Sequence, residues 1–209
     1  MRTKAVRMYG KNDLRLEEFE LPQMKEDEVL VKVMSDSICM STYKLVAQGK
    51  KHKRAPQNID TNPVIVGHEC SGIIVEVGEK WKNQFRPGQK FSLQPALNYQ
   101  GKLDSPGYSY EFCGGACTYC IMPHEVMELG CLLDYTGESF FEASLGEPMS
   151  CIIGGYHANY HTNKKNYGHA MGTKEDGNIL IMGGCGPMGL GAVSYGLQFE
   201  NKPRRIVVT

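Results

Sequence analysis

A glycine-rich turn near the end of the chain most strongly limits what these residues can fold into. The turn spans residues 184–189 (GCGPMG), has the pattern G-x-G-x-x-G, and directly follows the apolar run Asn178–Met182. A short continuous apolar run is typical of a strand covered on both faces, and the residues after the turn predict a helix to about Phe199. Residues 205–209 predict another strand. The order strand, turn, helix and strand predicts the beginning of a Rossmann doubly wound α/β domain.

The glycines of this turn have distinct predicted roles in holding a dinucleotide. The first permits a tight turn, the second lets a pyrophosphate approach the backbone, and the third allows close packing of helix on strand. The N-terminus of the helix would stabilise the phosphate charge. We therefore predict that NAD or NADP binds at Gly184, Gly186, Pro187, Met188 and Gly189. The acidic residue that separates the two cofactors is expected about 20 residues further on, past Thr209, so both stay open, as does a turn that binds nothing.

The first 148 residues follow a different hydrophobic period. Residues 3–33 alternate with period two, a further short strand follows at 73–77, and residues 85–91 are predicted to be a turn into another strand. Several short strands at this spacing predict an antiparallel barrel or sandwich. Helices are predicted after Gly137, including one near Pro148. We therefore predict a β-rich domain over residues 1–148 and the start of the dinucleotide-binding domain over residues 149–209.

Two polar stretches are predicted to be irregular, namely a long surface loop at residues 97–111 and a connector at residues 159–178. A doubly wound sheet also needs more than the two strands predicted here, and two strands alone would leave apolar faces exposed. We expect the 209 residues to be a truncated part of a longer enzyme, inactive as they stand.

Composition excludes several classes of partner. The chain has 23 Lys and Arg against 23 Asp and Glu, and this balance argues against a nucleic-acid binder, which needs a basic surplus. No run reaches the roughly 18 apolar residues of a membrane span, and the N-terminus does not resemble a secretory signal. We therefore expect a cytoplasmic protein that binds a small molecule, no membrane and no nucleic acid. Its eight cysteines are expected to be metal ligands or buried thiols rather than disulfides.

Four residues have side chains that suit a metal ion. Cys39, His68, Glu69 and Glu147 supply a thiolate, an imidazole and two carboxylates, a combination that suits Zn²⁺ in a catalytic site with one open position. Each residue alone also has an ordinary interpretation, since a cysteine can be core and most carboxylates are solvated. Spacing alone does not decide between these interpretations.

Longer motifs around these residues resemble one known family. Residues 63–72 (PVIVGHECSG), followed by residues 75–78 (VEVG), resemble the G-H-E signature of the zinc-containing medium-chain alcohol and polyol dehydrogenases. Glu147-Pro148 resembles the polyol branch, with sorbitol dehydrogenase-like members. Residues 94–99 (QPALNY) and 106–110 (PGYSY) resemble sugar-phosphate reductases of the L-sorbose 1-phosphate type. Further motifs in the same order are Glu28–Val33, Cys39–Ser41, Phe85–Gly88, Gly114–Ala116 and the nucleotide turn.

The resemblance implies a fold and an activity. It implies a GroES-like β-barrel catalytic domain followed by the beginning of a Rossmann domain, in an enzyme that forms homo-oligomers. Cys39 and His68 would bind one Zn²⁺, with Glu69 and Glu147 as ligands or exchangeable near-ligands. Ser41 would be catalytic as the hydroxyl of a proton relay, and Glu69 would be catalytic at the metal. The implied reaction moves a hydride between NAD(P) and a polyol, ketose or sugar phosphate, with L-sorbose 1-phosphate reduction as one example.

Two positions depart from the family pattern. The motif Cys-x-Ser-Asp-x-His reads CMSTYK here, so Thr42 replaces the aspartate that orients a zinc-bound histidine and Lys44 replaces the histidine at the end of the relay. Changes around metal ligands typically alter affinity or activity by about 10–100-fold. The alternatives are therefore a zinc-free reductase, or a non-catalytic binding protein with the same fold.

Two further groups of residues allow a functional interpretation. The basic run at residues 50–54 contains Lys51, Lys53 and Arg54, which we predict as an anion site for a sugar phosphate, with a solvated loop as the alternative. Four cysteines, at positions 113, 117, 120 and 131, could hold a structural zinc. We disfavour this because Cys117 and Cys120 would point to opposite faces of a predicted strand over residues 116–122. Buried thiols are the favoured interpretation.

Overall fold

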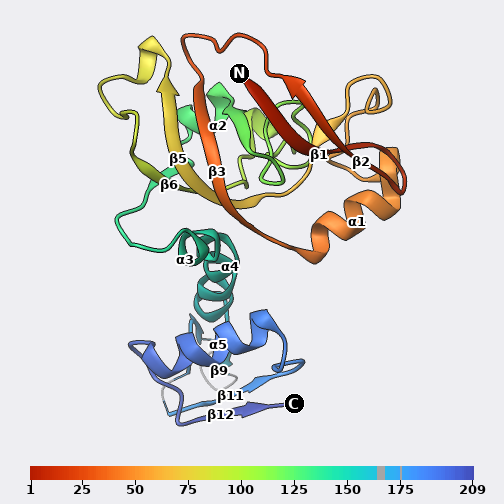
Figure 1. Cartoon of the computed structure of the whole chain (residues 1–209). Coiled ribbons are helices and arrows are strands. Elements are labelled where there is room, and N and C mark those ends of the chain that lie inside the picture. Colours follow the sequence, from red (N-terminus) through yellow and green to blue (C-terminus); the bar gives the residue numbers. More distant parts are fainter. Residues whose placement is uncertain (164–167, 175) are drawn as a thin grey trace. The chain divides into compact units, whose positions relative to one another are not determined.

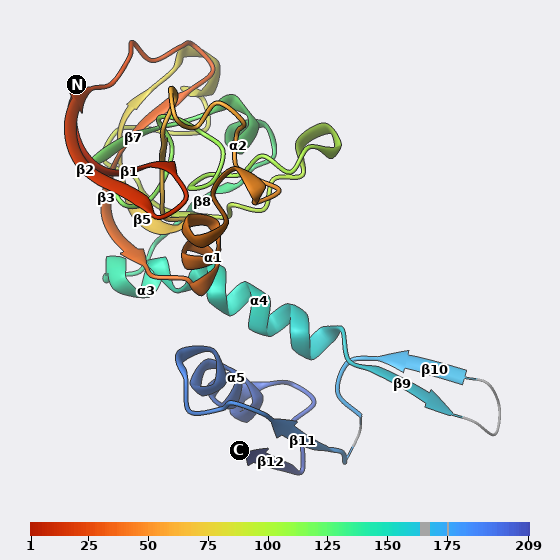
Figure 2. The ribbon, with the colours of Figure 1, turned by 90° about the vertical axis from the view of Figure 1, so that its right-hand side faces the viewer.

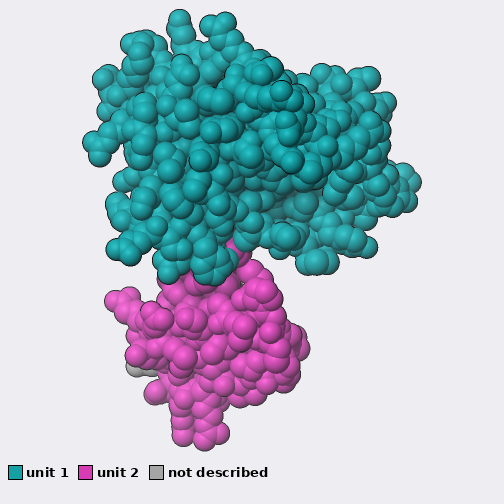
Figure 3. All heavy atoms as spheres, viewed as in Figure 1, with its two compact units in different colours: residues 1–147 teal, residues 148–209 magenta. Residues whose placement is uncertain are grey.

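The computed structural model describes residues 1–163, 168–174 and 176–209, which form two compact units, residues 1–147 and 148–209 (Figure 3). Unit 1 is mainly antiparallel β-structure and unit 2 is mixed α/β (Figure 1). The strands are β1 Arg2–Gly10, β2 Asp13–Glu20, β3 Val29–Ser37, β4 Val64–Ile65, β5 Glu69–Val77, β6 Lys90–Leu93, β7 Tyr119–Met122, β8 Leu132–Asp134, β9 Tyr160–Asn163, β10 Gly168–Met171, β11 Asn178–Ile181 and β12 Arg205–Val208. The α-helices are α1 Met40–Gln48, α2 His124–Glu128, α3 Phe140–Ser144, α4 Gly146–His157 and α5 Pro187–Gln198. Short 3-10 turns occupy Gly49–Lys51, Glu79–Trp81 and Tyr99–Gly101.

Unit 1 contains two antiparallel sheets that are linked through the backbone. The larger has the strand order β7-β3-β5-β6-β8 and the smaller has the order β2-β1-β4. The amide of Val6 donates to the carbonyl of Ala116 at 2.9 Å, and the amide of Thr118 donates to the carbonyl of Lys4 at 2.9 Å. These bonds join β1 to the segment before β7. The β-rich barrel-like domain predicted from the period-two pattern is therefore confirmed.

The longest strand pairing positions the residues that matter below. Strand β3 pairs with β5 over almost its full length, from Val29 opposite Val77 to Ser37 opposite Glu69. Val29 and Val31 of β3 are fully buried, and further along the strand Lys32 and Met34 are exposed while Val33 between them is half-buried. This alternation fixes the register, because a slip of one residue would expose the apolar set. The fixed register places the end of β3 beside the start of β5.

Unit 2 begins a parallel sheet. Strand β11 pairs in parallel with β12, and α5 forms the crossover between them, as the predicted order of strand, turn, helix and strand requires. A small apolar cluster of Ile152, Tyr156 and Phe199 is buried between the helices. Helices α4 and α5 have 12 residues each, and no helix within the described ranges has the length and apolar character needed to cross a membrane.

The polar connector predicted over residues 159–178 is wrong in part. It contains the antiparallel hairpin of β9 and β10 (Figure 2). Four backbone pairs define the hairpin, and the rings of Tyr160 and His169 stack across it at 5.5 Å. Cross-strand ring pairs of this kind stabilise short hairpins. The sequence did not predict these two strands because the stretch lacks the apolar alternation by which strands are recognised.

The strand predicted over residues 116–122 is shorter than expected. Strand β7 starts only at Tyr119, and Cys117 lies in a tight turn before it, where its amide donates to the carbonyl of Gly115 at 2.8 Å. The Cys113 thiol donates to the sulfur of Met122 at 3.6 Å, and the Cys117 thiol donates to the carbonyl of Gly114 at 3.1 Å. The Cys131 thiol is directed to the carbonyl of Leu129 instead. Within the described ranges these four cysteines do not form a group with the spacing of metal ligands.

Candidate metal centre

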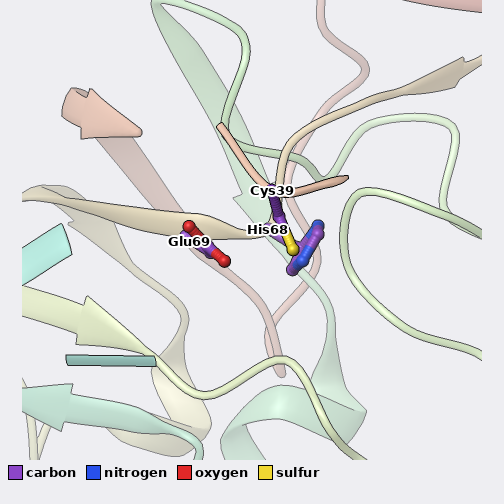
Figure 4. A group of neighbouring side chains, drawn as sticks. All are labelled: Cys39, His68 and Glu69. Atoms are coloured by element: carbon purple, nitrogen blue, oxygen red, sulfur yellow. The ribbon is translucent and has the colours of Figure 1, made fainter. Parts of the chain in front are cut away.

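Three potential metal ligands meet where β3 ends and β5 begins (Figure 4). Cys39 is the N-cap residue of α1, and its sulfur accepts the amide of Ser41. His68 directly precedes β5, and Glu69 is the first residue of that strand. One sulfur, one ring nitrogen and one carboxylate oxygen lie within 4.8 Å of one another. Within the described ranges, this is the only group of three or more His, Cys, Asp or Glu residues with that spacing.

The imidazole of His68 is held from both nitrogens. His68 is 4% exposed. The Thr42 hydroxyl lies 3.4 Å from Nδ1, and the Ser41 hydroxyl lies 3.2 Å from Nε2. Burial lowers the pKa of His68, the charge of Glu69 raises it and that of Arg54 lowers it. The ring is therefore favoured in its neutral form, which can bind a metal ion. Thr42 contacts the histidine from the position of the family's aspartate.

A tyrosine that sequence reasoning missed completes the polar contacts of this site. The Tyr108 hydroxyl donates to Ser41 Oγ at 2.7 Å and lies 3.3 Å from His68 Nε2. Ser41 in turn donates to the sulfur of Cys39 at 2.9 Å. Burial raises the pKa of Tyr108, and the hydrogen bond with Ser41 opposes that shift. The phenol is therefore a neutral donor at the side of the three ligands.

Tyr108 also corrects the prediction of a surface loop at residues 97–111. Tyr108 and Ser105 are each 2% exposed. The Ser105 hydroxyl donates to the carbonyl of Pro95 at 2.7 Å, and the Tyr108 ring packs against the His68 ring at 4.8 Å. Loops rich in Gly, Pro and Ser are usually exposed. Here only the resemblance of residues 106–110 to sugar-phosphate reductases could have drawn attention to Tyr108.

Glu69 is held by two neighbours from the end of β3. The Ser37 hydroxyl donates to its carboxylate, and its amide donates to the Asp36 carboxylate at 3.1 Å. Burial raises the pKa of Asp36 to about 7, although the hydrogen bond from the amide of Glu69 opposes this shift. Gly67 and Gly115 approach the Asp36 carboxylate so closely that a Cβ on either would lie 2.2 Å from one of its oxygens. The carboxylate of Glu69 is thus oriented before any ion binds.

Glu147 is not part of the three-residue group. It lies in the first turn of α4, and its charge raises the pKa of Tyr108. The structure therefore brings Cys39, His68 and Glu69 together and places Glu147 near the same site without making it a member of the group.

The predicted anion-site residues separate into two kinds. Lys51 and Lys53 are exposed. The Arg54 guanidinium instead lies over the Tyr108 ring, 5.1 Å from its centroid. The neighbouring Lys50 pairs with Asp60 at 2.8 Å.

The glycine turn leads directly into α5. Gly186 is the N-cap residue of α5, and Pro187 is the first residue of that helix. A Cβ on Gly189 would lie 2.3 Å from the Cα of Gly184, so helix and turn touch. A Cβ on Gly186 would meet nothing within 4 Å. The backbone at Gly186 is therefore open in the place where a pyrophosphate would approach.

Fold and site together define a class. An antiparallel barrel with a Cys-His-Glu ligand group, followed in the chain by a strand, glycine turn, helix and parallel strand, is the arrangement of zinc-type medium-chain dehydrogenases. Residues 25–134 match the family model described as the alcohol dehydrogenase GroES-like domain. The chain belongs to this family, and the predicted resemblance is confirmed.

Known relatives and a solved structure agree with this assignment. The chain is 47% identical over 207 residues to the L-sorbose 1-phosphate reductase of Klebsiella pneumoniae, covering 99% of this chain and 50% of that protein. It is 52% identical over 207 residues to the mannitol-1-phosphate 5-dehydrogenase of Aliivibrio fischeri, covering 99% of this chain and 49% of that protein. The chain thus spans about half the length of these relatives. The crystal structure of the 2R,3R-butanediol dehydrogenase from Bacillus subtilis has a TM-score of 0.74 at 24% identity, covering 99% of this chain and 57% of that one.

Proposed function

We propose that the chain belongs to a zinc-dependent oxidoreductase that moves a hydride between NAD(P) and a polyol, ketose or sugar phosphate. The ligand group of Cys39, His68 and Glu69, with the Ser41 hydroxyl beside it, carries this proposal. The two relatives, an L-sorbose 1-phosphate reductase and a mannitol-1-phosphate 5-dehydrogenase, support the substrate class, with L-sorbose 1-phosphate as one example.

The chemistry of the three side chains fits zinc. Thiolate, imidazole and carboxylate are the ligands that Zn²⁺ takes in catalytic sites, with a position left for water or substrate. Glu147, whose charge acts on the same site, would be an exchangeable fourth group. Bound zinc would supply Lewis acidity toward the substrate oxygen.

The remaining residues would move and hold protons. Ser41 Oγ lies between the Cys39 sulfur and the Tyr108 hydroxyl, so it can exchange a proton with a substrate hydroxyl bound at the ligand group. Tyr108 stays neutral and donates to a lone pair of Ser41, which leaves the Ser41 proton directed at the Cys39 sulfur. Thr42 orients His68 through Nδ1. Metal-bound histidines are commonly oriented by a hydrogen bond at the ring nitrogen that does not bind the metal.

The open backbone at Gly186 supports NAD(P) as the hydride carrier, because a side chain there would fill the space that a pyrophosphate needs. The residues that would hold the cofactor are Gly184, Gly186, Pro187, Met188 and Gly189. The nicotinamide would supply the hydride chemistry.

Metal analysis and turnover test the proposal on the full-length protein. We expect about one zinc per chain and NAD(P)-linked turnover on a panel that includes sorbitol, mannitol 1-phosphate and L-sorbose 1-phosphate. Full zinc occupancy without turnover on any member would contradict the proposal and favour a binding protein of the same fold.

Replacing Gly186 by Val should separate cofactor binding from stability. We expect the Kd for NADH or NADPH, measured by fluorescence titration, to rise at least about 10-fold, since the side chain occupies the approach to the backbone. The free energy of unfolding should fall by no more than about 1 kcal/mol, because a Cβ at Gly186 meets no protein atom within 4 Å and Val is only a poorer N-cap residue than Gly. Gly189→Val is the contrasting variant and should lose stability through its contact with Gly184. Unchanged cofactor affinity in Gly186→Val would show that the turn does not bind the dinucleotide.

Replacing Thr42 by Val should weaken zinc binding. The change keeps the shape of the side chain and removes the hydroxyl contact with His68 Nδ1. We expect zinc affinity, measured by competition with a chelator, to fall about 10–100-fold. Thr42→Ser retains the hydroxyl and should stay close to the unchanged protein. Equal affinity in the Val and Ser variants would exclude this role for Thr42.

A cytoplasmic location and a homo-oligomeric assembly also belong to the proposal. All eight cysteines lie in described residues and none forms a disulfide, which supports a reducing compartment. Gel filtration of the full-length protein tests the assembly.

A further inference from the structure

A cation without a counter-ion lies beside the candidate metal centre. The side chain of Arg54 makes no ion pair or hydrogen bond with any residue in the part of the chain that the structure describes; its one close partner is the Tyr108 ring. Its Nε is buried and has no hydrogen-bond partner. A buried donor of a charged group costs free energy when it stays unpaired. The site is therefore one in which a bound anion would stabilise the protein.

The backbone around Arg54 is tied to the segment that carries Tyr108. The Arg54 carbonyl accepts the Ser109 hydroxyl at 2.8 Å, and the Arg54 amide donates to His52 Nδ1 at 3.3 Å. The His52 ring stacks on the Tyr108 ring at 5.6 Å, with 16° between the planes. These contacts restrict the guanidinium to the neighbourhood of Tyr108, which reduces the conformational entropy that would be lost when a ligand binds.

Tyr108 connects this cation to the reacting end of the site. Its hydroxyl contacts Ser41 and lies 3.3 Å from His68 Nε2, while its ring contacts the guanidinium. The Arg54 charge also acts on His68, whose pKa it helps burial to lower. A substrate with its oxygen at the ligand group would therefore have a fixed positive charge close by.

The other basic residues of the same run do not share this setting. Lys50 is paired with Asp60, and Lys51 and Lys53 are exposed. Interactions of exposed charges are weakened by solvent and salt. A partly buried arginine also offers a planar fork of donors that matches two phosphate oxygens, which a lysine cannot do.

We propose that Arg54, held by Tyr108 and His52, binds the phosphate group of a polyol or ketose phosphate monoester whose reacting oxygen lies at Cys39, His68 and Glu69. This inference rests on the proposed function and deepens it, since it assigns the choice between phosphorylated and free sugars to one residue. It narrows the predicted anion site from three residues to Arg54 and leaves Lys51 and Lys53 outside the contact.

The test uses the full-length, zinc-loaded protein and the pair L-sorbose 1-phosphate and L-sorbose. For Arg54→Gln we expect kcat/KM to fall about 10–100-fold on the phosphate ester and less than about 3-fold on the free sugar. Arg54→Lys should recover part of this loss, because it restores the charge without the planar fork. Lys50→Gln removes one positive charge from the same run and serves as the matched control, with both substrates unchanged. Calorimetric titration with inorganic phosphate should give a Kd at least about 10-fold higher for Arg54→Gln than for the unchanged protein.

The outcomes separate this inference from the function on which it rests. If the unchanged protein turns over the phosphate ester and Arg54→Gln keeps the same preference over the free sugar, the assignment to Arg54 is wrong while the function stands. The same holds if Lys51→Gln or Lys53→Gln reproduces the loss and Arg54→Gln does not. If the unchanged protein turns over neither sugar, the proposed function fails, and the phosphate titration alone then decides: equal affinity in both proteins overturns the inference, and weaker affinity in Arg54→Gln supports it.

Discussion

Replacing Cys39 by Ala is expected to remove the proposed zinc from the full-length protein and to lower its kcat/KM at least about 10³-fold. Cys39 supplies the one sulfur of the ligand group, next to His68 and Glu69, and a site of two protein ligands holds zinc far less tightly than one of three. Losing a Lewis acid removes several kcal/mol of transition-state stabilisation, and each 1.36 kcal/mol corresponds to about 10-fold in rate. Zinc content by elemental analysis and kcat/KM for the preferred substrate measure the two effects.

Two further variants guard against a folding defect. Cys39 caps α1 through its sulfur, so Cys39→Ser retains a capping oxygen while offering zinc a poorer ligand, and it should lose zinc without losing α1. Cys131→Ala removes the thiol of a buried residue that donates to the Leu129 carbonyl, and it should keep full zinc and activity. A Cys39→Ala protein that keeps both its zinc and its turnover would rule out the proposed centre.

Replacing Gly67 by Ala should cost about 3 kcal/mol of unfolding free energy. Gly67 has φ +90°, a conformation that costs a residue with a Cβ about 1–2 kcal/mol. Its Cβ would lie 2.2 Å from an Asp36 oxygen and 2.7 Å from the amide nitrogen of Ala116, so backbone as well as side chain must move. Overpacking of this kind costs about 1–3 kcal/mol. Urea unfolding of the full-length protein measures the loss.

Gly88→Ala is a matched control for this effect. Gly88 also has a positive φ, +86°, but a Cβ there would meet nothing within 4 Å. It should therefore show the backbone cost alone, about 1 kcal/mol. The difference between the two variants isolates the close approach at Asp36. An equal loss of unfolding free energy in both variants would mean that Asp36 and Ala116 move aside at no measurable cost. Because Asp36 also accepts the amide of Glu69, zinc affinity should fall in Gly67→Ala and not in Gly88→Ala.

The architecture was largely predictable from the sequence because it depends on local periodicity. Alternating apolar residues predicted the barrel strands, and the apolar run before the glycine turn predicted the first strand of the second unit. The hairpin of β9 and β10 was not predictable in this way, since its stability comes from backbone pairing and a ring contact between Tyr160 and His169. Cys117 was misplaced because a two-residue departure from strand geometry leaves no mark in the hydrophobic pattern.

The ligand group was predictable from motifs, whereas its surroundings were not. Cys39, His68 and Glu69 stand in a long recognisable pattern, and the structure brings them together. Tyr108 lies some forty residues further along in a loop of ordinary turn composition, and only the folded chain places its hydroxyl on Ser41. Arg54 likewise differs from the neighbouring lysines because its guanidinium lies over the Tyr108 ring, a contact that only the folded chain shows. Contacts between segments that are far apart in the sequence cannot be predicted from the residues of either segment alone.

The pairing of β3 with β5 has a consequence for how the protein would acquire the proposed zinc. Cys39 follows the end of one strand and His68 precedes the other, so the donors converge only when the strands are in register. The intervening segment must be closed into a loop before an ion can be held by both, and this closure costs entropy. An ion that binds only the closed form stabilises it by mass action. We therefore expect zinc to be captured late in folding and to act afterwards as a lock on strand register, slowing unfolding more than it speeds folding.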